Sequence, residues 1–199
     1  ASPRAAAVAV GAASLARYHR ALTRRESGGA PSWRSQIEAT RVQWTRHVLR
    51  TEGWLYAIQA LRNAITANTF LASTVLSLFT VTTGYLRAVL QQGFDAVVVV
   101  QFSGLLALLL CSAYNFSQAA RLMTHAGFMF PVAGDADAGI LTPAAVERIM
   151  VKSSHCQWAG LRYLYHTLPV VCWILGGGAS GEYAFLVAAL LLTRGLGQI

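Results

Sequence analysis

The pattern of apolar and polar positions is dominated by long stretches without charge. Between Ala64 and Tyr85 the only ionisable side chain is that of the tyrosine itself. A helix of this length crosses the roughly 30 Å hydrocarbon core of a membrane. The four valines Val97–Val100 resemble a strand, but the apolar run that contains them is too long for one. The pattern therefore predicts membrane-spanning helices.

Five segments are predicted to enter the membrane: residues 1–16, 56–86, 96–123, 158–175 and 181–197. The first is alanine-rich and shorter than a comfortable span. Residues 17–55 form a basic segment, and within it Ser32–Arg50 is predicted to be an amphipathic helix at the membrane interface, with tryptophans such as Trp44 toward lipid. The predicted fold is all-α: one integral membrane bundle over residues 1–199, with four or five transmembrane helices plus an interfacial amphipathic helix.

Turn and capping residues predict several helix boundaries. The sequence Ser27–Pro31 contains two glycines and a proline, which is typical of a turn. A loop over residues 130–139 is predicted to end the third span. Thr142 is then expected to cap the next helix, with Pro143 at its first position. Ser180 is expected to cap the last helix.

Composition supports a membrane protein. The chain is 55% hydrophobic and 12% charged, against about 25% charged residues in soluble domains. Its net charge of +8 indicates contact with anionic lipid and not with nucleic acid. The connection 17–52 holds eight arginines, so the basic loops are predicted on the stromal, matrix or cytoplasmic side. The first 25 residues contain no acidic residue, which is typical of organellar targeting segments. This favours a thylakoid or mitochondrial inner membrane. A first membrane helix with a basic flank fits the same residues equally.

Two polar clusters are candidate sites. Gln59, Arg62, Asn63 and Asn68 lie at the start of the second span, where an arginine near lipid suggests an anion, lipid-headgroup or partner site. The alternative is that Arg62 only reaches to the lipid phosphates or caps the carbonyls of a neighbouring helix. A second stripe follows the end of the third span at helical spacing. With Arg162, both clusters are predicted to form a polar seam or to contact lipid and partner subunits, the stripe being Asn115, Gln118, Arg121 and His125.

Imidazole and amide side chains also suggest pigment binding, because such groups ligate haem or the magnesium of a chlorophyll. The candidate ligands are Asn115, Gln118, His125, His155 and His166. No paired-histidine motif accompanies them, so no cofactor of the chain's own is predicted, and no metal site; bound lipids are expected.

No catalytic motif occurs in the sequence, and none of the eight acidic residues lies in the middle of a predicted span. The chain is therefore predicted not to be an enzyme. The leading hypothesis is an accessory, structural subunit of a larger photosynthetic or respiratory membrane complex, with other membrane subunits and anionic lipids as partners. The alternatives are a small-molecule or anion transporter that uses Arg62 and Arg162, and a pigment- or haem-binding subunit.

Three segments resemble the uncharacterised membrane family known as domain-of-unknown-function family 599, found in bacteria and plants. The family's A-V-Q-T-L-R-N motif is similar to Ala57–Asn63, and its G-L-R-x-Y-Y motif is similar to Gly160–Tyr165, with Pro169 following. An arginine–tryptophan pair is matched loosely by Arg41 and Trp44. The resemblance implies the membrane architecture and the importance of Arg62 and Arg162, but no reaction.

Overall fold

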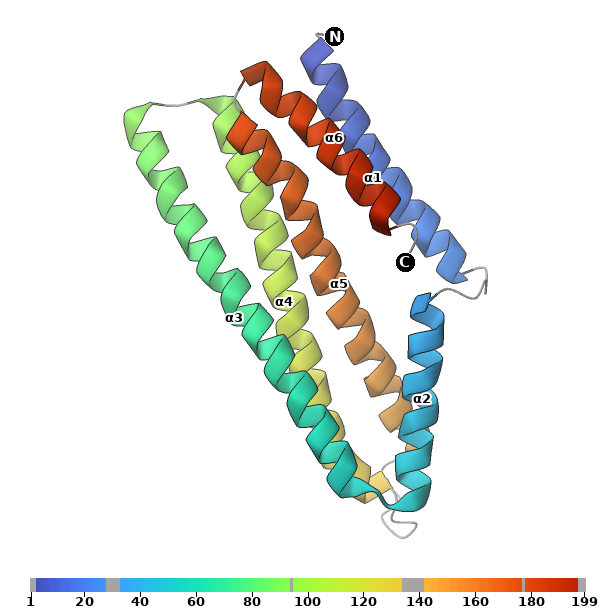
Figure 1. Ribbon diagram of the computed structural model, residues 1–199. Coiled ribbons are helices and arrows are strands. Elements are labelled where there is room, and N and C mark those ends of the chain that lie inside the picture. Colours follow the sequence, from blue (N-terminus) through green and yellow to red (C-terminus); the bar gives the residue numbers. More distant parts are fainter. Residues whose placement is uncertain (1–2, 28–32, 94, 134–141, 177, 197–199) are drawn as a thin grey trace. The chain divides into compact units, whose positions relative to one another are not determined.

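A computed structural model describes residues 3–27, 33–93, 95–133, 142–176 and 178–196. These ranges contain only helices, which confirms the all-α prediction. The helices are α1 (Pro3–Ser27), α2 (Trp33–Thr51), α3 (Trp54–Gln92), α4 (Ala96–Ala133), α5 (Pro143–Gly176) and α6 (Gly178–Leu196) (Figure 1).

The start of α5 agrees with the sequence. The helix begins at Pro143, and the Ala145 N–H donates a hydrogen bond to the Thr142 carbonyl, with 2.8 Å between the atoms. The predicted loop was wrong at its start, because α4 continues through Pro131 to Ala133. Phe130 and Ala133 are both buried, so apolar packing maintains the helix past the proline. The rest of that loop, from residue 134, lies outside the described ranges.

The start of α6 differs from the prediction. The helix begins at Gly178, so Ser180 lies inside it and is not its cap. The Ser180 hydroxyl donates instead to the Gly176 carbonyl at the end of α5. Because of this hydrogen bond, the side chain does not cap α6. The N-terminal helix is also longer than residues 1–16, because α1 runs unbroken to Ser27. The predicted turn after it, at residues 28–31, lies outside the described ranges.

Two of the described helices, α3 and α4, are long and apolar enough to cross a membrane. This criterion rests on length and composition alone, so it weakly suggests membrane association. The other described helices do not meet it; α6 contains a shorter apolar stretch, Ser180–Thr193. Two of the predicted four or five membrane spans are therefore supported, and the others stay a prediction.

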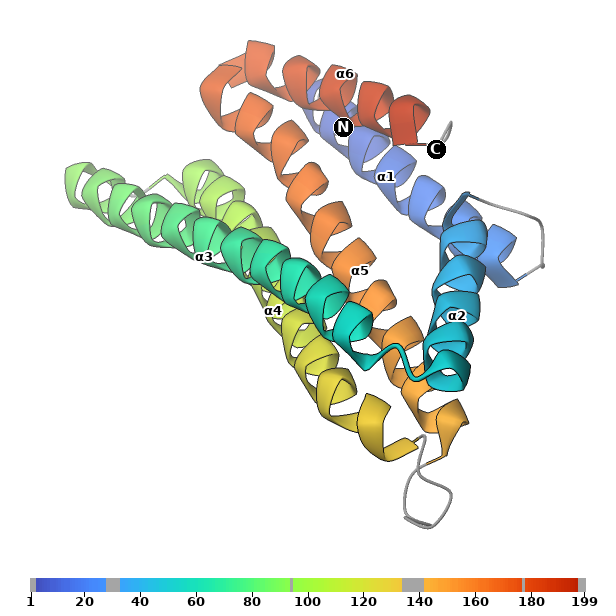
Figure 2. The same cartoon turned by 60° about the horizontal axis from the view of Figure 1, so that its bottom comes forward.

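The chain divides into two compact units. Unit 1 comprises Ala1–Trp33, Ser77–Leu110 and Arg162–Ile199, and within it α1 packs along α6 (Figure 2). A side-chain carbon at Gly11 would lie 2.7 Å from a ring atom of Phe185, so the glycine permits this close approach. The Phe185 ring also lies beside the Trp173 ring, at a centroid distance of 5.6 Å.

Unit 2 comprises Arg34–Leu76 and Cys111–Leu161, and its core is an apolar cluster shared by α2, α3, α4 and α5. The Trp44 ring meets the buried Phe130 ring edge-on, at 5.9 Å between centroids. Trp44 therefore packs against protein, where the sequence predicted lipid. The buried members of the cluster are Val48, Ala57, Leu61, Met123, Ala126, Phe130, Ala133, Val146 and Met150.

Nearer the start of α4, unit 2 contains a close contact between α4 and α5. A side-chain carbon at Gly160 would lie 2.9 Å from the ring of Phe116, which is fully buried. The Ser112 hydroxyl donates to the Gly160 carbonyl at 2.8 Å. Glycine is therefore required here because the two helices approach closely, and the hydrogen bond sets their register.

Candidate functional site

Three pairs of polar side chains join α2 to α5 in unit 2. They are Glu38 with His155 (Oε1 to Nε2, 3.0 Å), Arg41 with Gln157 (Nη2 to Oε1, 2.9 Å) and Arg46 with Glu147 (Nε to Oε1, 2.8 Å). We call this set the α2–α5 contact. In the first and third pairs the α2 residue number rises by eight while the α5 number falls by eight, so the two helices run antiparallel.

Arg41 is a half-buried charge of the α2–α5 contact. Burial lowers the pKa of its guanidinium, while the nearby Glu38 carboxylate acts in the opposite direction. The intrinsic pKa of arginine is so high that the side chain stays protonated at neutral pH. Its Nη2 bonds Gln157, but its buried Nη1 has no hydrogen-bond partner among the described residues. Arg41 therefore retains the capacity to donate to a polar group.

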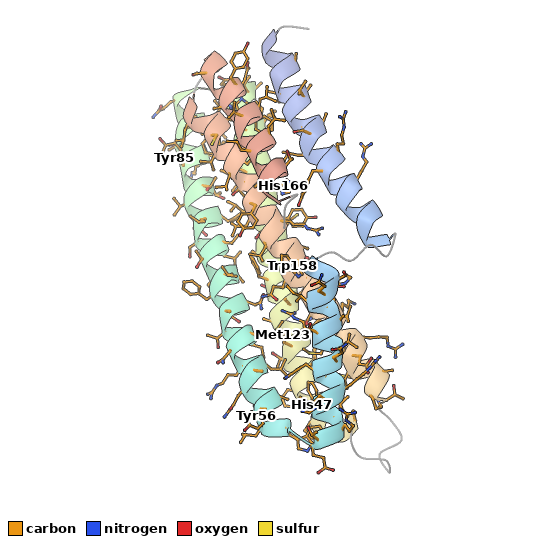
Figure 3. All side chains as sticks on the ribbon, turned by 45° about the vertical axis from the view of Figure 1, so that its right-hand side comes forward. His47, Tyr56, Tyr85, Met123, Trp158 and His166 are labelled. Atoms are coloured by element: carbon orange, nitrogen blue, oxygen red, sulfur yellow. The ribbon has the colours of Figure 1, made fainter. Side chains whose placement is uncertain are left out.

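Asn68 of α3 is the member of the predicted Arg62 cluster that is buried in unit 2. Its side chain is fully buried, and its Nδ2 donates to the Ala64 carbonyl at 2.8 Å and lies 3.9 Å from the Met123 sulfur on α4. Met123 is labelled in Figure 3. Asn68 therefore brings a polar side chain of α3 into contact with α4, whereas Arg62 is exposed.

The other three residues of the predicted α3 cluster lie on the surface of the helix. Gln59, Arg62 and Asn63 are all exposed. In the part of the chain that the structure describes, none of the three side chains bonds a residue of another helix. Tyr56, at the same end of α3, is 77% exposed and projects outward in Figure 3. This arrangement is compatible with contacts to lipid or to a partner, and the predicted seam between this cluster and α4 stays a prediction.

The predicted stripe on α4 is divided between two environments. Asn115 and Gln118 are half-buried, whereas Arg121 and His125 are exposed. The Asn115 amide donates to the Cys111 carbonyl of its own helix at 2.8 Å. The four residues therefore lie along one edge of α4. The two amide side chains are more buried than the side chains of Arg121 and His125.

The predicted residues of α5 have partners within the chain. Nε2 of His155 is occupied by Glu38, and Nδ1 of His166 lies 2.5 Å from the Arg162 carbonyl oxygen, a contact in which Nδ1–H donates. His166 and Arg162 are both half-buried. Among the described residues no three His, Cys, Asp or Glu side chains are grouped as metal ligands. Pigment binding by these residues stays a prediction.

The Arg46–Glu147 pair predicts a pH effect on stability. The hydrogen bond from Arg46 lowers the pKa of Glu147 below its ordinary value of 4.5. A lowered folded-state pKa means that the pair contributes stability above pH 4.5, and that this contribution is lost as the pH falls through the lowered value. We expect the difference in thermal midpoint between pH 7 and pH 3 to be smaller for Glu147→Gln than for the unmodified chain. The effect is small because Arg46 is 65% exposed, and parallel midpoint curves for both proteins would contradict it.

Sequence reasoning missed the α2–α5 contact. Its signal was present as the matched spacing of two pairs, Glu38 with Arg46 on one segment and Glu147 with His155 on the other. Each segment carries an acid and a base eight residues apart, and two antiparallel helices bring the unlike charges together. A sequence search for antiparallel helix pairs would therefore use the order of acidic and basic residues along each segment.

The fold and these contacts define a class: an all-α protein with two helices of membrane-spanning length and a polar contact between two further helices. The chain matches the family described as "Protein of unknown function, DUF599" over residues 6–196, and it belongs to that family. This confirms the resemblance seen in the sequence. Comparison with curated proteins and with solved structures finds no match.

Proposed function

We propose that the chain is a membrane-embedded accessory subunit, which stabilises a larger membrane assembly through helix packing and lipid contact. The observation that carries the proposal is the exposure of α3. Of its most apolar 18-residue window, 17% is buried within the chain. An apolar helix surface of this extent needs a lipid or protein environment.

The spacing of charges along α3 and α4 supports a membrane environment. Residues 63–86 carry no charge, and a helix of this length extends for about 36 Å. Arg62 and Arg87 flank it, where long side chains reach the lipid headgroups. Residues 96–120 of α4 are likewise uncharged, between Asp95 and Arg121. Both lengths match the roughly 30 Å hydrocarbon core with some tilt.

The exposed surface of α3 also favours contact with another helix. The hydroxyls of Thr66, Thr74 and Thr83 donate to carbonyls four residues earlier at 2.8–2.9 Å, so they need no outside partner. A side-chain carbon at Gly84 would meet nothing within 4 Å. Small residues with satisfied polar groups allow membrane helices to approach one another closely. This supports a partner subunit in addition to lipid.

The proposal predicts that α3 surface residues matter for assembly and not for folding. Phe70 and Val81 are 69% and 70% exposed and lie three helical turns apart. We expect the double variant Phe70→Ala/Val81→Ala to be released from a large complex on native gels of mildly solubilised membranes. Its thermal midpoint in detergent should stay close to that of the unmodified chain.

Val75 provides the matched control, because it lies on the same helix but is 1% exposed. Val75→Ala should lower the thermal midpoint, since it removes buried methyl groups. Recovery of the unmodified chain from native membranes as a free monodisperse monomer would overturn the proposal. An absorption band in the purified chain would favour pigment or haem binding instead. Anion flux in liposomes that is lost in Arg62→Ala would favour transport.

The location of the assembly is part of the same proposal. We infer an organellar membrane, thylakoid or mitochondrial inner, with the basic segments on the stromal or matrix side. The acid-free N-terminal region and the eight arginines of residues 17–52 support it. Identification of the co-purifying subunits by mass spectrometry distinguishes photosynthetic from respiratory membranes.

A further inference from the structure

One edge shared by α4 and α5 in unit 2 carries basic side chains that have no acidic partner. Arg121 and His125 lie on α4, and Arg148 and Lys152 lie on α5; all four are exposed. In the part of the chain that the structure describes, none of the four forms an ion pair. We call these four residues the α4–α5 basic edge.

The register of the two helices places these side chains at matching levels. The hydrogen bond from Ser112 to the Gly160 carbonyl fixes the register, and the helices run antiparallel (Figure 1). Arg121 lies nine residues after Ser112, and nine residues before Gly160 is Val151. Arg121 is therefore level with the neighbour of Lys152. The other two basic residues lie opposite one another about one turn farther from the hydrogen bond.

Cys156 shows that the basic residues of α4 and α5 share one edge. It lies one turn from Lys152 on α5. Burial raises the pKa of its thiol, while the positive charges of Lys152 and Arg121 lower it. Arg121 is therefore close to the side of α5 that carries Lys152. Glu147 is the one acidic residue of α4 and α5, and it is directed to α2, where it pairs with Arg46.

The α4–α5 basic edge begins where the uncharged part of α4 ends. Residues 96–120 carry no charge, and Arg121 is the first charged residue after them. If α4 spans the bilayer, Arg121 and Lys152 lie at the level of the lipid phosphates. This placement rests on the membrane location in the proposed function. Tyr114, two turns before Arg121 on the same face of α4, is 62% exposed and then lies beside the acyl chains.

We propose that the α4–α5 basic edge binds the headgroup of an anionic phospholipid. Arg121 and Lys152 donate hydrogen bonds to its phosphate, and the guanidinium can form two in parallel. Basic sites between membrane helices bind such headgroups. Arg148 lies one turn closer to water, where it repels a headgroup that carries a cation beyond its phosphate. The edge therefore selects phosphatidylglycerol over phosphatidylcholine, in which a quaternary ammonium follows the phosphate.

Native mass spectrometry of the intact chain released from lipid nanodiscs tests this site. The nanodiscs contain equal amounts of phosphatidylglycerol and phosphatidylcholine, and the spectra count the lipids that stay bound. We expect the unmodified chain to retain several-fold more phosphatidylglycerol. Arg121→Gln/Lys152→Gln should lose this preference, because each basic residue at the membrane surface attracts anionic lipid. Both residues are exposed, so the thermal midpoint should change little.

Arg62→Gln/Arg87→Gln is the matched control, because it removes the same net charge from two exposed positions on α3. This variant should keep the preference, and so should the charge-conserving variant Arg121→Lys/Lys152→Arg. Equal retention of the two lipids by the unmodified chain would overturn the proposal. An equal loss in both glutamine variants would do the same, because the attraction would then come from net charge alone.

Two further outcomes distinguish this site from its alternatives. Displacement of phosphatidylglycerol by inorganic phosphate would contradict a lipid site and indicate a site for a soluble anion. A chain that does not enter nanodiscs at all would contradict the membrane location in the proposed function as well. A chain that enters them without lipid preference would contradict the binding site alone.

Discussion

Replacement of Phe130 by alanine should lower the free energy of unfolding by about 3–5 kcal/mol. Phe130 is fully buried, lies in the apolar cluster of unit 2 and meets the Trp44 ring edge-on. Alanine removes the ring and leaves a cavity among residues of several helices, which relax only in part. The loss is measured by denaturant or thermal unfolding of the purified chain in detergent.

Phe128 is the matched control for this prediction. It lies two residues earlier on α4 and is 75% exposed. Phe128→Ala should change stability by no more than about 0.5 kcal/mol, because it leaves no internal cavity. Equal losses in the two variants would contradict the buried position of Phe130. A loss in Phe130→Ala alone would place this side chain in the interior, although the sequence predicted a loop that begins at Phe130.

The sequence predicted most helices because each carries its own local signal. Pro143 after Thr142 indicates a helix start, and the long uncharged stretches of α3 and α4 allow no other regular structure. The end of α4 was wrong because Pro131 is a strong local signal for a break, while the burial of Phe130 and Ala133 is a tertiary effect. Predictions from local sequence do not include the free energy of this tertiary packing.

The environment of α2 could not be predicted from its periodicity. An apolar stripe with tryptophans looks the same whether it faces lipid or protein, and the Trp44–Phe130 contact decides the matter for one face. The α2–α5 contact depends on a pairing between segments about a hundred residues apart in the sequence, such as Arg46 and Glu147. Single-sequence patterns carry no information about which of several compatible helices will pair.

The candidate site was also only partly predictable from the sequence. Arg62 attracted notice in the sequence because a charge near an apolar span is unusual, yet the structure leaves it exposed. Asn68, six residues later in the same predicted cluster, is buried instead. Only the rotation of α3 against α4 distinguishes the two positions, and that rotation follows from packing of residues such as Leu61 and Val75.

Replacement of Leu76 by arginine should prevent stable insertion of α3 into a membrane. Leu76 is 45% exposed and lies near the middle of the uncharged residues 63–86. An arginine at the centre of a membrane helix costs about 2.5–3.5 kcal/mol on insertion scales, and the favourable leucine term is lost as well. The chain offers no acid within this stretch to compensate the charge. Insertion is measured with glycosylation sites placed on either side of α3, in microsomes.

Gln59→Arg is the control for this experiment, because the same charge is then added to an exposed position one turn from Arg62. A charge at that end of the helix reaches the headgroups, so insertion should equal that of the unmodified chain. If Leu76→Arg inserted as efficiently as Gln59→Arg, the middle of α3 would not lie in hydrocarbon. The exposed apolar surface of α3 would then have to be covered by protein alone, and the proposed contact with lipid along this helix would be wrong.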